Sequence, residues 1–149
     1  MIHTYKKIYA WLVHLFTASG AVFGVLALYE VYRGNIFWAF FYIAISIIID
    51  AIDGTLARLV EIKKYANIDG ALLDNIIDFL TFVVVPSFMV LTMSIVPPDW
   101  KIPCMIMIVL ASCYQFTQPD AKTEDHFFKG FPSYWNIAIF YLYYWQTHQ

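Results

Sequence analysis

Long apolar stretches alternate with short polar breaks along this chain. The breaks are Gly34-Asn35, the charged segment 58–69, Pro97-Pro98-Asp99 and the polar segment 118–129. About 20 apolar residues in a helix cross the ~30 Å hydrocarbon core of a bilayer, where only helices and closed barrels pair their whole backbone. The pattern therefore predicts helical membrane spans over five ranges, which are Trp11–Tyr32, Ile36–Ala57, Leu72–Val96, Ile102–Phe116 and Phe131–Trp145.

The composition supports a membrane protein. Of the 149 residues, 61% are apolar and 13% are charged, whereas a soluble domain carries about 25% charged residues. The nine Lys and Arg residues are scattered, which excludes a basic stripe for nucleic acid. No internal repeat or low-complexity linker divides the chain. We therefore expect one all-α transmembrane domain over residues 1–149.

The basic residues predict the orientation of the spans. If the N-terminus lies in the cytoplasm, seven Lys and Arg residues fall on the cytoplasmic side and two fall in the outer loops. The seven are Lys6, Lys7, Arg58, Lys63, Lys64, Lys122 and Lys129, and the two are Arg33 and Lys101. This asymmetry follows the positive-inside rule. It predicts that the junction between the second and third spans faces the cytoplasm.

Four aspartates lie at that junction inside otherwise apolar helices. Asp50 and Asp53 are near the end of the second span, and Asp74 and Asp78 are near the start of the third. Residues three or four apart share a helix face, so each pair projects together. Four aspartates at the bilayer centre would cost roughly 10–14 kcal/mol at about 2.5–3.5 kcal/mol each. Their place near helix ends lowers this cost without removing it.

A bound cation would offset the remaining cost. All the candidate ligands are carboxylates without a nearby His or Cys, which favours Mg²⁺ or Mn²⁺, and two such ions would suit phosphoryl chemistry. Arg58 can hold a phosphate through two hydrogen bonds, and the small residues Gly54 and Ala57 allow close approach. For each of these residues taken alone, an ion pair at the helix end, such as one between Asp53 and Arg58, remains an alternative explanation.

The spacing of these residues resembles the signature of a known family. The sequence Asp50-x-x-Asp53-Gly54-x-x-Ala57-Arg58, then eleven residues, then Gly70-x-x-x-Asp74-x-x-x-Asp78 is similar to the motif of the CDP-alcohol phosphatidyltransferases. The eleven-residue spacer, 59–69, is longer than in most of the family and is typical of its bacterial phosphatidylcholine synthase branch. The segments 73–78 and 122–136 also look like that branch.

The resemblance implies a role for each matching residue. Asp50, Asp53, Asp74 and Asp78 match the family's metal-binding acids, which implies a site for two ions, Mn²⁺ or Mg²⁺. Asp78 also matches the base that acts on the incoming alcohol. The positions that match the CDP-binding residues are Asp50, Gly54, Ala57 and Arg58, and Thr17 and Gly20 resemble a weaker pattern near the nucleotide.

The resemblance also implies a reaction, the transfer of a phosphatidyl group from CDP-diacylglycerol to choline with release of CMP. A quaternary ammonium is bound well by aromatic faces, at about 0.5–2 kcal/mol each. Aromatic and acidic residues flank the last polar segment, and the candidates for a choline site are Phe131, Tyr134, Trp135, Glu124 and Asp125. Aromatic residues are also common anchors at membrane interfaces, so that interpretation stays open.

Two further functions remain open at this point. Serine, inositol phosphate or glycerol phosphate could be the acceptor, and Lys63 and Lys64 would suit a phosphorylated one. Acids within a membrane can also line a cation-transport path. Such a path predicts acids spread through the membrane depth, whereas these gather at one end beside a basic residue.

Location and completeness are further expectations. The resemblance implies a multi-pass protein of the bacterial inner membrane whose active site faces the cytoplasm, and homodimers are frequent in the family. The family core has six membrane helices, whereas five spans are visible here. We therefore expect the helical bundle to be incomplete at its C-terminus.

Overall fold

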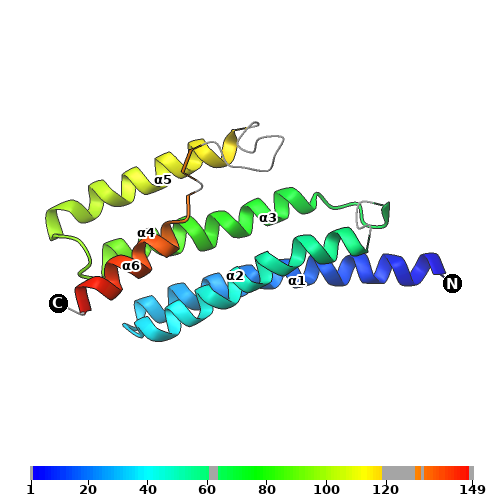
Figure 1. Ribbon diagram of the computed structural model, residues 1–149, viewed down its shortest axis with the longest axis horizontal. Coiled ribbons are helices and arrows are strands. Elements are labelled where there is room, and N and C mark those ends of the chain that lie inside the picture. Colours follow the sequence, from blue (N-terminus) through cyan, green and yellow to red (C-terminus); the bar gives the residue numbers. More distant parts are fainter. Residues whose placement is uncertain (1, 61–63, 119–129, 132, 148–149) are drawn as a thin grey trace.

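A computed structural model describes residues 2–60, 64–118, 130–131 and 133–147 of the chain (Figure 1). All the regular elements in these residues are helical, and the α-helices are α1 (Ile2–Tyr32), α2 (Ile36–Leu59), α3 (Gly70–Asp78), α4 (Val85–Thr92), α5 (Lys101–Thr117) and α6 (Trp135–Thr147). A π-helical segment, Phe79–Val84, joins α3 to α4, and a short 3₁₀ turn, Pro98–Trp100, precedes α5.

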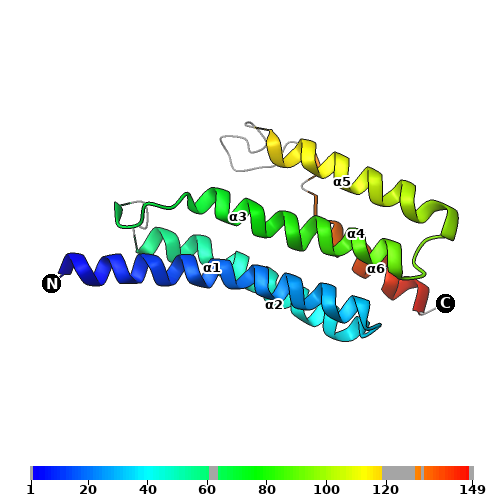
Figure 2. The same ribbon diagram turned by 180° about the vertical axis from the view of Figure 1, so that it is seen from behind.

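The helices run along one long axis, with the two termini at opposite ends (Figures 1 and 2). α1 and α2 form an antiparallel pair on one side, α3 and α4 continue one another in the middle, and α5 lies on the side away from that pair. The α2–α3 connection lies at the N-terminal end of the bundle, and the α1–α2 turn lies at the other end. The main core forms among α1, α2, α4, α5 and α6.

The predicted break at Gly34-Asn35 is a tight turn between α1 and α2. Gly34 has a φ of +78°, a left-handed conformation that glycine adopts without steric cost. The side-chain amide of Asn35 donates to the carboxylate of Glu30 at 2.7 Å, and this hydrogen bond closes the turn. The turn makes α1 and α2 antiparallel neighbours.

The third span is one continuous rod with a wide turn in its middle. Within the segment Phe79–Val84 the backbone N–H of Val85 donates to the carbonyl of Leu80, five residues back. Pro86 follows directly, and proline has no N–H and its ring collides with the carbonyl four residues before it. A π-helical turn accommodates that ring while the helix continues. Asp78 therefore ends α3 immediately before an irregular turn.

Glycines allow α1 to lie close to the third span. A methyl group added at Gly24 would lie 3.0 Å from Leu80 Cδ2 and 3.1 Å from Thr81 Cγ2. A methyl group at Gly20 would lie 3.0 Å from Ile77 Cγ2. Small residues at such crossings let helix backbones approach in membranes.

We expect Gly24→Ala to destabilise the protein by about 1 kcal/mol. Overpacking costs about 1–3 kcal/mol, and the higher helix propensity of alanine returns about 0.5–1 kcal/mol. Gly54→Ala is the matched control, because only Arg58 Nη1, at 3.8 Å, would come within 4 Å of the new methyl group. Thermal unfolding in detergent should show a lower Tm for Gly24→Ala and an unchanged or higher Tm for Gly54→Ala. Equal Tm values would contradict this packing.

The apolar pattern identified the spans well. Four helices of the described residues are long and apolar enough to cross a membrane, and they are Tyr5–Tyr32, Ile36–Leu59, Gly70–Thr92 and Pro98–Thr117. The prediction of an all-α membrane fold is confirmed.

The structure differs from the prediction at the fifth span. Gly130 and Ser133 have φ values of 87° and 60°, so the backbone before Trp135 is not helical. α6 therefore begins at Trp135, four residues after the predicted start of this span at Phe131.

Candidate functional site

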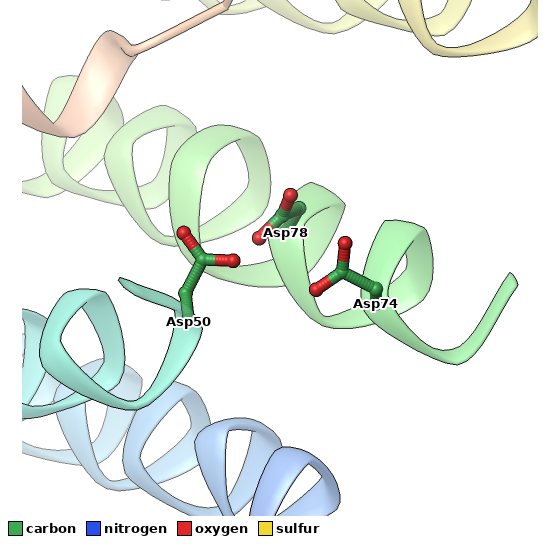
Figure 3. Close-up of side chains that lie close together, drawn as sticks. All are labelled: Asp50, Asp74 and Asp78. Carbon is green, nitrogen blue, oxygen red and sulfur yellow. The ribbon is translucent and has the colours of Figure 1, made fainter. Parts of the chain in front are cut away.

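Three aspartates from two helices converge on one small space. Asp50 projects from α2, and Asp74 and Asp78 project from α3 (Figure 3). One carboxylate oxygen from each lies within 4.8 Å of the others, and all three residues are half-buried. Acids more than twenty positions apart in the sequence therefore form a single cluster.

The start of α3 is fixed locally by its cap. The Asp69 side chain accepts hydrogen bonds from the backbone N–H groups of Ala71 and Leu72, both at 3.1 Å. This satisfies two of the N–H groups that the first turn of a helix leaves without partners. Asp74 and Asp78 follow one turn apart and so share the face that is turned to α2.

The donor set of this cluster fits a hard divalent cation. Two carboxylate charges that lie within 4.8 Å of each other repel by at least about 3 kcal/mol at an effective dielectric constant of 20. A cluster of three carboxylates is therefore energetically favourable when a cation or another positive charge offsets this repulsion. Mg²⁺, Mn²⁺ and Ca²⁺ prefer oxygen ligands. The three carboxylates thus supply the oxygen ligands that such an ion requires.

Asp53, the fourth predicted metal ligand, lies outside this group. It is buried on the same stripe of α2 as Ser46 and Ile49. That stripe faces α1, because the Ser46 hydroxyl donates to the carbonyl of Gly20 at 3.2 Å. A metal role for Asp53 stays a prediction.

Beyond Asp53, the end of α2 is open on one side. Gly54 is exposed, and Arg58 folds back along the helix so that its Nη2 donates to Thr55 Oγ1 at 3.1 Å. Ala57 instead packs into a small cluster with Ala10 of α1. The structure therefore leaves space beside Gly54 and Arg58, whereas Ala57 supports the helix pair.

The resemblance implies a CDP-lipid beside Gly54, and in that case Gly54→Ala should weaken its binding without destabilising the protein. The new methyl group would meet almost nothing within the protein, so it would occupy only space that a ligand needs. Equilibrium binding should show a Kd raised by roughly tenfold, which corresponds to about 1.4 kcal/mol. Ala111→Ser, a small change at an exposed position of α5, is the contrasting variant, and binding should not change there. An unaltered Kd for Gly54→Ala would contradict a ligand at this position.

The two candidates on α1 are buried between helices. Thr17 Oγ1 donates to the Val13 carbonyl at 3.2 Å within its own helix. Gly20 sits where α1 meets Ser46 of α2 and Ile77 of α3, and this contact alone accounts for a glycine there. Their proposed nucleotide roles stay predictions.

Tyr134 lies close to the acid cluster. Its ring packs edge-to-face on Phe82 with a centroid distance of 5.3 Å. Burial raises the pKa of the Tyr134 phenol above its usual value, and the negative charges of Asp50 and Asp78 raise this pKa further. The phenol is therefore neutral at physiological pH. One aromatic candidate for the choline site therefore lies near enough to the acids to be affected by their charge.

The other choline candidates occupy different surroundings. Trp135 is anchored to α5, because its Nε1 donates to Ser112 Oγ at 2.9 Å. Phe131 is exposed and packs on Trp135 with a centroid distance of 4.9 Å. Glu124 and Asp125 lie outside the described residues.

The prediction from sequence missed one buried polar residue beside the site. His14 is 5% exposed and its ring lies against Gly70 at the start of α3, where an added methyl group would be 3.1 Å from its Cε1. The His14 Nε2 atom has no hydrogen-bond partner among the described residues. The sequence did carry one indication that His14 lies on this side of α1, because it precedes Thr17 by three residues and so shares its helix face.

The chain is similar to several known proteins. Residues 10–146 match the profile of the family described as CDP-alcohol phosphatidyltransferase. A protein of Legionella pneumophila named phosphatidylcholine synthase is 51% identical over 140 residues, which cover 93% of this chain and 55% of the relative. A Borreliella burgdorferi protein of the same name is 41% identical over 133 residues, covering 89% and 57%.

The similarity extends to more distant bacteria. A Pseudomonas aeruginosa protein, also named phosphatidylcholine synthase, is 32% identical over 144 residues, covering 96% of this chain and 60% of the relative. The chain spans about half the length of the curated relatives it matches. No solved structure matches it significantly. From the acid motif, its spacing and the profile match, the chain belongs to the CDP-alcohol phosphatidyltransferase family.

Proposed function

We propose that this protein acts as a phosphatidylcholine synthase, transferring the phosphatidyl group of CDP-diacylglycerol to choline and releasing CMP. The observation that carries the proposal is the convergence of Asp50, Asp74 and Asp78 within 4.8 Å beside Tyr134. The names of the similar proteins support the choice of acceptor.

The acid cluster would hold one or two divalent ions, Mn²⁺ or Mg²⁺. Asp50, Asp74 and Asp78 would supply the ligands, with Asp53 as the predicted fourth acid. A bound ion would supply positive charge that neutralises the pyrophosphate of the lipid substrate. The protein's own contribution is to hold the reacting groups in place, which is the larger part of catalysis in phosphoryl transfer.

Asp78 would act as the base. Its carboxylate would accept the proton of the choline hydroxyl as that oxygen bonds to the phosphorus carrying diacylglycerol. The bond from this phosphorus to the oxygen of CMP breaks, and CMP leaves with the bonding electron pair. The half-buried position of Asp78 at the end of α3 suits this role, since a base must come within about 3 Å of the hydroxyl or act through one water.

The exposed end of α2 would bind the nucleotide part of the substrate. The Arg58 guanidinium can hold a phosphate oxygen pair, and the space beside Gly54 admits the ligand. Asp50, Ala57, Thr17 and Gly20 complete the predicted nucleotide set. The Tyr134 ring would contact the choline ammonium, with Trp135 and Phe131 as further aromatic candidates.

The position of the basic residues supports a cytoplasmic site in the bacterial inner membrane. Lys6, Lys7, Arg58 and Lys64 lie at the end of the bundle that holds the α2–α3 connection, and Arg33 and Lys101 belong to the other end. This distribution follows the positive-inside rule. A homodimer stays part of the proposal on the strength of the resemblance alone.

An acceptor panel tests the proposed substrate. Membranes containing the protein receive CDP-diacylglycerol, Mn²⁺ and one of choline, serine, inositol phosphate or glycerol phosphate, and CMP release is measured. We expect CMP release with choline alone. Release with another acceptor and none with choline would replace choline in the proposal, and an acceptor-independent release would indicate hydrolysis instead.

A further inference from the structure

A groove lies between α6 and the part of α2 that precedes Asp50. Its volume is about 250 Å³, and most of its lining is apolar, including Phe40, Ala44 and Ile47 of α2 and Ile137 and Phe140 of α6. This volume is below the ~300–1,000 Å³ of sites for whole small molecules. The groove therefore suits one flexible chain rather than a complete ligand.

The groove is continuous with the proposed reaction site. Ile47 precedes Asp50 by three residues, which is one helical turn or about 4.5 Å along α2. On α6 the lining begins at Asn136, two residues after Tyr134. Toward the opposite end, Phe40 packs edge-to-face on Phe140 with a centroid distance of 5.2 Å. A chain could enter beside the acids and end at this aromatic pair.

One polar group in the lining has no partner. Asn136 is 2% exposed, and its Nδ2 atom has no hydrogen-bond partner within the described part of the chain. Its Oδ1 accepts from the backbone N–H of Ile137 at 2.8 Å. Because the oxygen is engaged by that donor, the unsatisfied end is the NH₂ donor. A buried donor without an acceptor is costly.

The chemistry of the lining defines what would fill the groove. The occupant must be apolar along its length and must offer an acceptor, without a donor, near the acid cluster. An acyl ester meets both conditions, because its carbonyl accepts only and lies between the phosphate and the hydrocarbon chain of a glycerolipid. Ile137, Phe140 and Tyr141 are 44–63% exposed, so such a chain could enter laterally from the bilayer.

We propose that the α2–α6 groove binds one acyl chain of the phosphatidyl donor and that the Asn136 amide donates a hydrogen bond to its ester carbonyl. This inference rests on the proposed function, since it takes the lipid to be the donor held at the acids. It assigns Asn136 a role in lipid binding rather than in the chemical step.

Photolabelling tests the groove. CDP-diacylglycerol with a diazirine midway along one chain is irradiated in membranes that contain the full chain, without any acceptor alcohol, and adducts are located by mass spectrometry. We expect adducts on the lining residues Ala44, Ile47 and Ile137 that excess unlabelled CDP-diacylglycerol prevents. Ala44→Trp should reduce them roughly fivefold or more. The matched control is Ala111→Trp, which alters an exposed site on α5 and should change nothing.

Competition by two lipids tests the hydrogen bond. Diester and diether forms of CDP-lipid compete with the photolabel, and we expect wild-type protein to prefer the diester by roughly threefold to tenfold. Asn136→Leu should abolish this preference. Asn136→Met should abolish it too, because methionine has no hydrogen-bond donor. A preference that survives in both variants would overturn the role of Asn136.

The outcomes separate this proposal from the proposed function. Adducts spread over exposed residues such as Leu110, or adducts that the competitor does not reduce, would overturn the groove, as expected if another protein segment or a second copy fills it. Formation of phosphatidylcholine without groove labelling would overturn the groove alone. Groove labelling without formation of phosphatidylcholine would support the groove and overturn the proposed acceptor.

Discussion

Asp78→Asn is expected to lower kcat for phosphatidylcholine formation by about 10²–10⁴-fold, the usual contribution of a general base. Asparagine keeps the size of the side chain and one oxygen but cannot take the proton of the choline hydroxyl. The loss should fall mainly on kcat, with a smaller effect on KM for CDP-diacylglycerol, because nucleotide contacts at the end of α2 are unchanged. Steady-state kinetics in mixed micelles with Mn²⁺ would measure both.

Asp69→Asn is the matched control for that variant. Asp69 is an exposed acid at the start of the same helix, where it caps two backbone N–H groups, and asparagine is an equally good cap. It removes one negative charge close to the site without removing the proposed base. We expect kcat within about twofold of wild type for this control, a difference of about 0.4 kcal/mol. Comparable kcat values for Asp69→Asn and Asp78→Asn would contradict a base role for Asp78.

Mn²⁺ should stabilise the protein strongly. A ligand that binds only the folded state contributes about 2.7 kcal/mol when its concentration is one hundred times its Kd. For a chain of this size that corresponds to a rise in Tm of roughly 5–10 °C. Thermal unfolding with and without Mn²⁺ would measure the rise.

Asp74→Asn should remove most of that stabilisation. Without metal, the variant should melt at or above the wild-type Tm, because one of three neighbouring negative charges has been neutralised. With Mn²⁺, its Tm should rise much less than that of wild type. Asp99→Asn, an exposed acid in the short turn before α5, should behave as wild type. An equal Mn²⁺ effect in Asp74→Asn would contradict the three-acid site.

Asp53→Asn separates the two descriptions of the site. The sequence motif places Asp53 among the metal ligands, whereas in the structure Asp53 lies on the buried stripe that faces α1. If the group of three dominates ion binding, the Mn²⁺-induced rise in Tm will be lost more fully in Asp74→Asn than in Asp53→Asn.

The convergence of the acids was predictable because its determinants are local. Gly34-Asn35 makes α1 and α2 antiparallel, and the acids lie at the two helix ends that flank one connection. Residues four apart, such as Asp74 and Asp78, must share a face. Because the two spans cross the same bilayer, the end of the second span and the start of the third lie at the same depth in the membrane.

Other features depend on contacts that a linear pattern does not contain. Asp50 and Asp53 point about 60° apart on an ideal helix, so the position of α1 decides that Asp53 is covered while Asp50 is not. The π-helical turn after Asp78 depends on how the helix accommodates Pro86, because a proline in an apolar stretch is also compatible with a kink or a break. Tyr134 meets the acids only through the folding of residues far along the chain.

One assay tests the central claim most directly, that the acid cluster is a metal-dependent site of phosphatidyl transfer to choline. Membranes containing the protein are incubated with CDP-diacylglycerol, labelled choline and Mn²⁺, with and without a chelator, beside membranes that contain Asp50→Asn. We predict labelled phosphatidylcholine from the wild-type protein with Mn²⁺, and none with the chelator or the variant. Undiminished product in the presence of the chelator, or no labelled lipid from folded wild-type protein when a control synthase is active in the same membranes, would contradict the claim.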